Sequence, residues 1–119
     1  MHEFSIMQSV MENVERVAKE HHARKIEAIN LRIGDMTEVV QDSLDFAFEV
    51  LRQGTLAEDA TLHVETIKPF SECLDCGNTF EHERTDLRCP ACGSSITKQL
   101  KGHELDIASI ELDIPENQS

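Results

Sequence analysis

The sequence predicts an α+β fold: a small three-stranded sheet with two helices on one face, plus an inserted zinc ribbon. Three observations predict it. Two segments carry apolar residues at three- and four-residue steps, which is typical of amphipathic helices. Three other segments alternate apolar and polar residues, as half-buried strands do. Two Cys-x-x-Cys-Gly motifs lie between the second and third of these strands.

The first helix is expected over residues 4–20, with an apolar stripe that we interpret as core. Ser5 and Gln8 resemble a capping box, which would start the helix at Ile6 and leave residues 1–4 as an arm. A start nearer Glu3 fits the pattern equally well. The apolar stripe consists of Phe4, Met7, Val10, Met11, Val14, Val17 and Ala18.

The second helix is expected over Ser43–Gln53, where Leu44, Ala47, Phe48 and Leu51 form the apolar stripe. Asp42 is the candidate N-cap because its short carboxylate can accept a bond from a free N–H of the first turn. Gly54 follows the last periodic residue, where a glycine often ends a helix.

The strands are expected over Ile26–Ile33, Thr61–Lys68 and Leu105–Asp113. The apolar alternation reverses its phase within the third strand, which predicts a bulge near Ala108 and Ser109. Strands linked by a helix usually run parallel, whereas the strand after the insert could pair antiparallel with its predecessor.

The chain is expected to form an α/β domain from residues 1–69 and 100–114, interrupted by the ribbon over residues 70–99. Residues 115–119 are expected to be a disordered tail. The chain has 119 residues, which suits one modest core.

Composition excludes several classes of function. The net charge is −12, and no segment offers the basic face that neutralises phosphates or anionic lipid. Nucleic acid and membrane are therefore not expected partners. No apolar run approaches the ~20 residues of a membrane span, and the N-terminus lacks a signal-peptide pattern. We expect a cytoplasmic protein.

The strongest signal is the pair of motifs that contain Cys73, Cys76, Cys89 and Cys92, with a glycine after each pair. Two residues between cysteines let both thiolates reach one ion, and four thiolates close a tetrahedral site. This spacing predicts structural zinc; iron also accepts four sulfurs, and a redox pair is the weaker alternative. Few apolar residues lie in the insert, so we expect it to fold only with its ion.

The N-terminus is the second candidate metal site. His2 places an imidazole beside the α-amino group of Met1, so the amine, the His2 amide and the ring can chelate one ion. Such a set suits square-planar Ni(II) or Cu(II), and Glu3 adjoins it. The remaining histidines are expected in ordinary roles: His21 and His22 at a helix end, and His63, His82 and His103 on the surface.

Several motifs together resemble the HypA/HybF family of nickel metallochaperones for hydrogenase maturation. They are Met1–Ser5, an Ile-Gly-Asp turn after the first strand, Phe46–Glu49, the two cysteine motifs and the final Ile-Glu-Leu-Asp strand. The resemblance covers about residues 1–114. The family often carries an acid near position 40, whereas this chain has Val39 and Val40, flanked by Glu38 and Asp42.

The resemblance implies nickel delivery to the large-subunit precursor of [NiFe]-hydrogenase, with HypB as a partner GTPase, and urease as a further client in some relatives. It implies nickel at Met1, His2 and Glu3, and structural zinc at the four cysteines. A homodimer is left open. No nucleophile–base pair or phosphate-binding loop is evident, so we expect no catalysis. The alternative function is a zinc-ribbon module for protein interaction or transcription, without nickel transfer.

Overall fold

The computed structural model describes residues 2–115, which divide into two compact units. The predicted tail therefore lies outside the described residues, apart from Pro115. The first unit comprises Met1–Leu31, Val39–Val64 and Ile107–Ser119, and the second comprises Arg32–Glu38 and Glu65–Asp106.

Both predicted helices are present in the first unit. Helix α1 spans Glu3–Glu20, and its first intrahelical bond runs from the Ile6 N–H to the His2 carbonyl at 3.0 Å. The capping-box start at Ile6 is therefore wrong and the earlier start is confirmed. Neither α1 nor any other helix among residues 2–115 is long and apolar enough to cross a membrane.

Helix α2 spans Gln41–Leu51, so it begins two residues before the predicted start. Asp42 is not its N-cap: Val40 occupies that position, in an extended conformation and without a side-chain capping bond. Valine has no side-chain acceptor, so the first turn of α2 needs an acceptor from elsewhere in the fold.

The predicted strands form a three-stranded sheet in the order β2-β1-β6. They span Lys25–Gly34 (β1), Thr61–Ile67 (β2) and Leu105–Asp113 (β6). The Arg24 N–H donates to the Asp113 carbonyl at 2.8 Å, and the Gly34 N–H donates to the Glu104 carbonyl at 2.7 Å. The start of β1 thus lies beside the end of β6, and the end of β1 beside the start of β6, so β6 runs antiparallel to β1. The expected pairing of β6 with its predecessor β2 is wrong.

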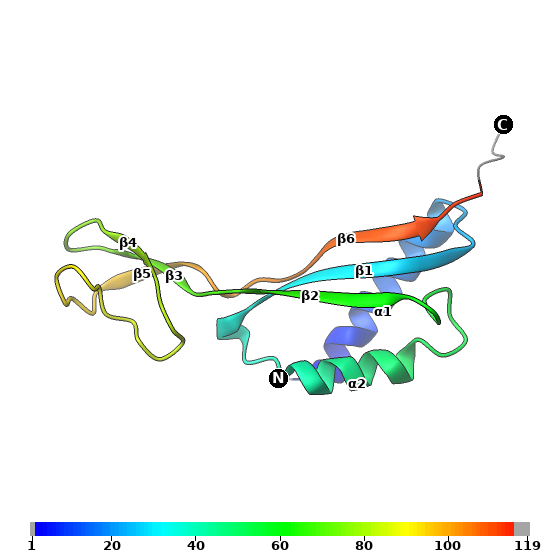
Figure 1. Ribbon diagram of the computed structural model, residues 1–119, viewed down its shortest axis with the longest axis horizontal. Coiled ribbons are helices and arrows are strands. Elements are labelled where there is room, and N and C mark those ends of the chain that lie inside the picture. Colours follow the sequence, from blue (N-terminus) through cyan, green and yellow to red (C-terminus); the bar gives the residue numbers. More distant parts are fainter. Residues whose placement is uncertain (1, 116–119) are drawn as a thin grey trace. The chain divides into compact units, whose positions relative to one another are not determined.

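The core of the first unit lies between this sheet and the two helices, which pack against each other and cover one of its faces (Figure 1). The outward side chains of β1 are polar, and Asn30 donates to Ser109 of β6 at 3.0 Å. In β6, exposed Ala108 and Ser109 separate half-buried Ile107 from Ile110, while the predicted bulge itself stays a prediction. The largest fully buried side chains of this core are Met7, Val14, Ile26, Ile29 and Leu44.

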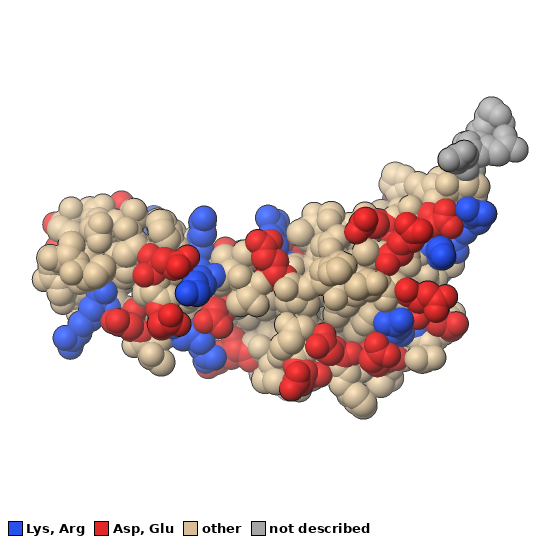
Figure 2. Space-filling model, in the orientation of Figure 1, with Lys and Arg blue, Asp and Glu red and all other residues tan. Residues whose placement is uncertain are grey.

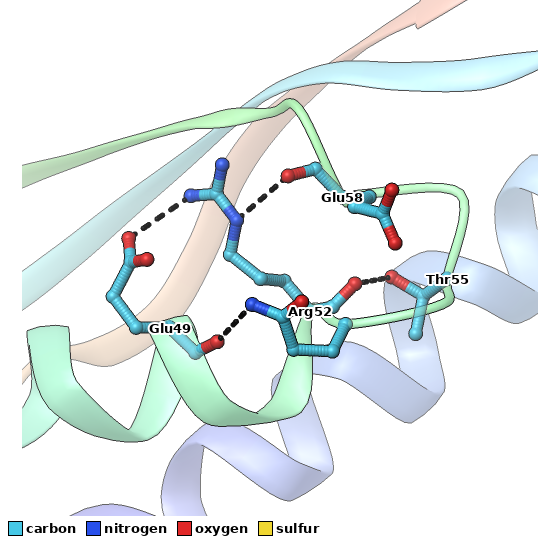
Figure 3. A network of polar contacts seen from close by, with 5 residues as sticks. Glu49, Arg52, Thr55 and Glu58 are labelled. Atoms are coloured by element: carbon cyan, nitrogen blue, oxygen red, sulfur yellow. Dashed lines mark hydrogen bonds and ion pairs between the residues drawn. The ribbon is translucent and has the colours of Figure 1, made fainter.

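The C-terminal end of α2 is closed by a polar network around Arg52 (Figure 3). The Arg52 guanidinium donates to the Glu58 carbonyl at 2.8 Å and pairs with Glu49 at 3.2 Å, and it stacks over the Phe48 ring. Gly54 has a φ of +72°, which a glycine adopts without strain, although it lies beyond the C-cap at Arg52. This network fixes the loop that leads into β2.

The second unit contains a short helix, η1 (Asp35–Thr37), and a sheet in the order β4-β3-β5. Its strands β3 (Phe70–Cys73), β4 (Thr79–Glu81) and β5 (Thr97–Lys101) were not predicted, because three to five residues are too few to show an alternation. Both neighbours pair antiparallel with β3, so Cys73 lies opposite Thr97 and Glu72 opposite Thr79.

Gly34 and Gly102 of this unit cross at very short range. A Cβ on Gly34 would lie 2.1 Å from the carbonyl carbon and oxygen of Gly102. The Met36 N–H donates to that same carbonyl at 2.8 Å. Only glycine at position 34 allows this approach, which holds η1 against the segment that follows β5.

Candidate metal centres

Two similar turns carry the four cysteines. In the first, the Gly77 N–H donates to the Cys73 carbonyl at 2.9 Å; in the second, the Gly93 N–H donates to the Cys89 carbonyl at 2.8 Å. Both glycines adopt a positive φ, +78° and +77°, which lets the backbone of each turn fold back beneath the two sulfurs of its motif. The glycine that follows each motif therefore permits the tight turn that brings the two cysteines of that motif together.

The four sulfurs lie together. The ligand atoms of Cys73, Cys76, Cys89 and Cys92 are all within 4.8 Å of one another, and this is the one cluster of potential metal ligands among residues 2–115. The Cys73–Cys92 and Cys76–Cys89 sulfur pairs are each 3.6 Å apart. Sulfurs about 2.3 Å from one tetrahedral ion lie about 3.8 Å from each other, so the set fits zinc.

Cys73 and Cys89, the first cysteine of each motif, are buried and tend toward the thiolate. At Cys73 the N–H of Cys76 lowers the thiol pKa and outweighs burial. At Cys89 burial raises the pKa, but the N–H groups of Cys92 and Ala91 dominate together and bring the pKa to about 6. Cys89 therefore offers negative charge to a cation at neutral pH, and the lowered pKa of Cys73 favours its thiolate in the same sense.

Cys76 and Cys92 are exposed and retain their protons more strongly. The N–H groups of Asn78 and Ser94 lower the two pKa values, but the neighbouring thiols outweigh them. The pKa of Cys92 is raised to about 12. A divalent ion supplies the charge that removes these protons, so metal binding releases protons and closes the site.

Side chains other than the four cysteines orient the cluster, and the sequence analysis missed them. The Asn78 amide donates to the Cys89 sulfur at 3.7 Å, which links the first turn to a ligand of the second. Ser94 donates to the Asp75 carboxylate across the same two turns. The signal in the sequence was the polar residue that follows each Cys-x-x-Cys-Gly motif.

The N-terminal site is described in part. Met1 lies outside the described residues, whereas His2 is exposed and is the N-cap of α1. Its imidazole is therefore accessible to an ion at the helix start. The first turn of α2 lies close by, because His2 and Asp42 line one shared groove.

Glu3 supplies the acceptor that α2 needs. Its Oε2 accepts the Val40 N–H at 2.9 Å, a bond between residues 37 positions apart. This bond is the main reason why the pKa of Glu3 is lowered; the N–H of Glu3 itself adds to the effect. The position where the family often has an acid thus contributes a backbone N–H, so the Val40 side chain does not decide this contact.

The predicted surface position of His82 is wrong, whereas His63 and His103 are exposed as expected. His82 follows β4 and is 9% exposed, and its ring packs against the ring of Phe80. Its Nε2 lies 2.8 Å from the Ser71 hydroxyl, and its Nδ1 lies 2.7 Å from the Glu83 carbonyl. Two polar partners satisfy the ring nitrogens, which allows a histidine to be buried.

Comparisons with known proteins agree with this geometry. The family described as "Hydrogenase/urease nickel incorporation, metallochaperone, hypA" matches residues 1–112. The hydrogenase maturation factor HypA of Aquifex aeolicus is 37% identical over 114 residues, which cover 96% of this chain and 99% of that protein. HypA of Rhizobium leguminosarum is 38% identical over 112 residues, covering 94% and 99%.

A solved structure resembles the whole chain as well. The solution structure of the Ni metallochaperone HypA from Helicobacter pylori is 31% identical, covers 97% of this chain and 100% of its own, and has a TM-score of 0.68. A second HypA solution structure gives a TM-score of 0.70 at 31% identity. The chain therefore belongs to the HypA family of metallochaperones for nickel incorporation into hydrogenase and urease.

Proposed function

We propose that this protein binds Ni(II) at its N-terminus and delivers it during maturation of [NiFe]-hydrogenase, while four cysteines hold a structural zinc ion. Family membership over residues 1–112 is the observation that carries the nickel role. Urease is a second client under the same family description. In this role the chain carries a metal and does not catalyse a reaction.

The cysteine cluster supports the zinc half of the proposal. Its four sulfurs leave no open coordination position, as in structural zinc sites, where catalytic sites keep one free. Cysteines that hold zinc have to stay reduced, which supports the reducing cytoplasm as the location of the protein.

The N-terminal geometry supports the nickel half. His2 is exposed at the start of α1, and the α-amino group of Met1 precedes it by one residue. An amine, an amide nitrogen and an imidazole nitrogen suit square-planar nickel. Glu3 belongs to the same site: Oε2 accepts the Val40 N–H, which leaves Oε1 as an oxygen donor beside His2.

The proposed organisation follows from these two sites. Residues 1–69 and 100–114 form the nickel-binding domain, and residues 70–99 form the zinc ribbon. We assign a HypB-type GTPase and the hydrogenase large-subunit precursor as protein partners, with nucleotide hydrolysis on the GTPase. Unlike a nucleic-acid partner, such proteins do not require a basic face, and the net charge is −12.

The experiment is a nickel titration of the untagged protein with zinc measured in parallel. His2→Ala is expected to abolish tight nickel binding and to leave zinc content and folding unchanged. A short extension before Met1 is expected to weaken nickel binding nearly as much, because it removes the free amine and keeps every side chain. His63→Ala is the matched control, since His63 is an exposed histidine on β2. Unchanged nickel affinity in both N-terminal variants would move the site elsewhere.

A further inference from the structure

An apolar groove lies beside His2, between the first turns of α1 and α2. It has a volume of about 580 Å³. Phe4 contributes from α1 and Phe46 from α2, and these side chains are 48% and 69% exposed. The groove is lined by His2, Glu3, Phe4, Ser5, Asp42, Ser43, Phe46 and Ala47.

Packing of the core does not account for the phenylalanine at position 46. The inward face of α2 carries Leu44, Ala47 and Phe48, which are all buried. Phe46 lies on the outward face together with Val50, one helical turn later and 46% exposed. A contiguous apolar stripe on a solvent-facing helix, next to a groove, is typical of a binding surface.

Carboxylates surround this stripe. Asp42, Asp45 and Glu49 are exposed on α2, and Figure 2 shows acidic surface along that helix. The one basic residue of this helix is its C-cap Arg52, whose side chain is only 18% exposed and is already paired with Glu49. The groove thus combines an apolar floor with a negative rim, in which Asp42 and Asp45 have no ion-pair partner among residues 2–115.

We propose that this α2 groove (the eight lining residues with the Phe46–Val50 stripe) is a docking site for a protein segment that carries apolar anchors flanked by Lys or Arg. Apolar anchors fill the space between Phe4 and Phe46, and the basic residues meet Asp42 and Asp45. This inference rests on the proposed function in one respect: docking there holds the partner beside the nickel-bearing His2.

The charge of the rim disfavours two other occupants. Two copies of this chain would bring like-charged carboxylates together around the same groove, which costs binding energy. An anionic lipid surface would be repelled by the same rim. A basic protein segment gains from both the apolar floor and the carboxylates, and the charge complementarity also speeds its association.

The test measures the binding of purified HypB-type GTPase and of hydrogenase large-subunit precursor from the same organism to the full chain. Phe46→Ser is expected to weaken the binding of at least one of them by about tenfold. Asp45→Lys is expected to weaken it about threefold, through slower association at low salt. The controls are Leu105→Ser, a 43% exposed apolar residue on β6, and Glu27→Lys, an exposed acid on β1; both should bind like wild type.

A nickel titration of the same variants separates this inference from the proposed function. Phe46→Ser and Asp45→Lys should bind nickel like wild type. If wild type binds no nickel but Phe46→Ser still loses partner binding, the proposed function fails and the docking site stands.

The inference is overturned by equal partner affinity in wild type and Phe46→Ser, or by a nickel-binding wild type that binds neither protein. It is also overturned if Phe46→Ser disperses a concentration-dependent dimer, which would make a second copy the occupant. Groove-dependent binding to phosphatidylglycerol vesicles would overturn it in favour of a membrane.

Discussion

Zinc removal is expected to melt the ribbon around β3, β4 and β5 and to leave the two-helix unit folded. The buried apolar cluster of the ribbon consists of Cys73, Phe80 and Cys89, and two of these are proposed zinc ligands. Burying a phenylalanine stabilises a fold by about 1.5–3 kcal/mol, whereas zinc binding contributes roughly 10–16 kcal/mol in zinc-finger peptides. The ion, not the apolar core, therefore decides whether the ribbon folds.

The size of the expected signal follows from where the helices lie. The 18 residues of α1 and the 11 residues of α2 belong to the first unit, and the second unit has only the three residues of η1. Circular dichroism at 222 nm should thus keep at least about nine-tenths of its helical signal after chelation, even if η1 also melts, because the helical unit opens independently. Amide resonances of residues 70–101 should collapse to random-coil positions in an ¹⁵N correlation spectrum.

Returning one equivalent of zinc should restore the lost resonances, and Cys89→Ala should look like the chelated protein from the start. A zinc-saturated sample with the chelator present serves as the control for direct effects of the chelator. Dispersed ribbon resonances in verified zinc-free protein would refute the reasoning. So would a helical signal that falls together with the ribbon, because the two units would then not be independent.

Three further predictions concern single contacts. Glu3→Gln should lower the melting temperature at pH 7, because the ionised carboxylate accepts the Val40 N–H. The fold lowers the pKa of Glu3, so this stabilisation is fully present above about pH 4.3, the pKa in the unfolded chain. It fades as the pH falls through the lower pKa of the folded protein. A wild-type advantage that stays constant down to pH 3 would contradict it. Gly34→Ala should cost about 1–3 kcal/mol or more in urea unfolding, since its Cβ would meet the Gly102 carbonyl at 2.1 Å. Gly54→Ala is its control, with nothing within 4 Å and an expected strain of about 1 kcal/mol from its φ of +72°; equal costs would show that the crossing does not matter. Asn78→Ala should weaken zinc binding about tenfold in a competition titration, because it removes the amide that donates to the Cys89 sulfur. Asn13→Ala on α1 is the control and should leave zinc affinity unchanged. Unchanged zinc affinity in Asn78→Ala would refute the role of this amide in holding the zinc ligand.

The sequence by itself determined the features that depend on neighbours along the chain. The helical period of α1 and α2, the alternation in β1, β2 and β6, and the Cys-x-x-Cys-Gly spacing each record a local geometry. A Cys-x-x-Cys turn needs only a glycine with positive φ, so Gly77 and Gly93 could be assigned without a fold. The chelating potential of Met1 and His2 is local in the same way, and their role as the nickel site stays a prediction.

Tertiary structure decided the features that join distant residues. The first and last strands of the chain, β1 and β6, pair with each other, and no local sequence pattern predicts that β6 pairs with β1 and not with β2. Residue patterns likewise do not reveal that Glu3 accepts the Val40 N–H, because the acceptor lies 37 residues from its donor. His82 was predicted to lie on the surface because the sequence does not show its partners. The Ser71 hydroxyl and the Glu83 carbonyl come within hydrogen-bond distance of its ring in the fold in which β4 pairs with β3. Long-range contacts carry no period in the sequence, so packing alone determined them.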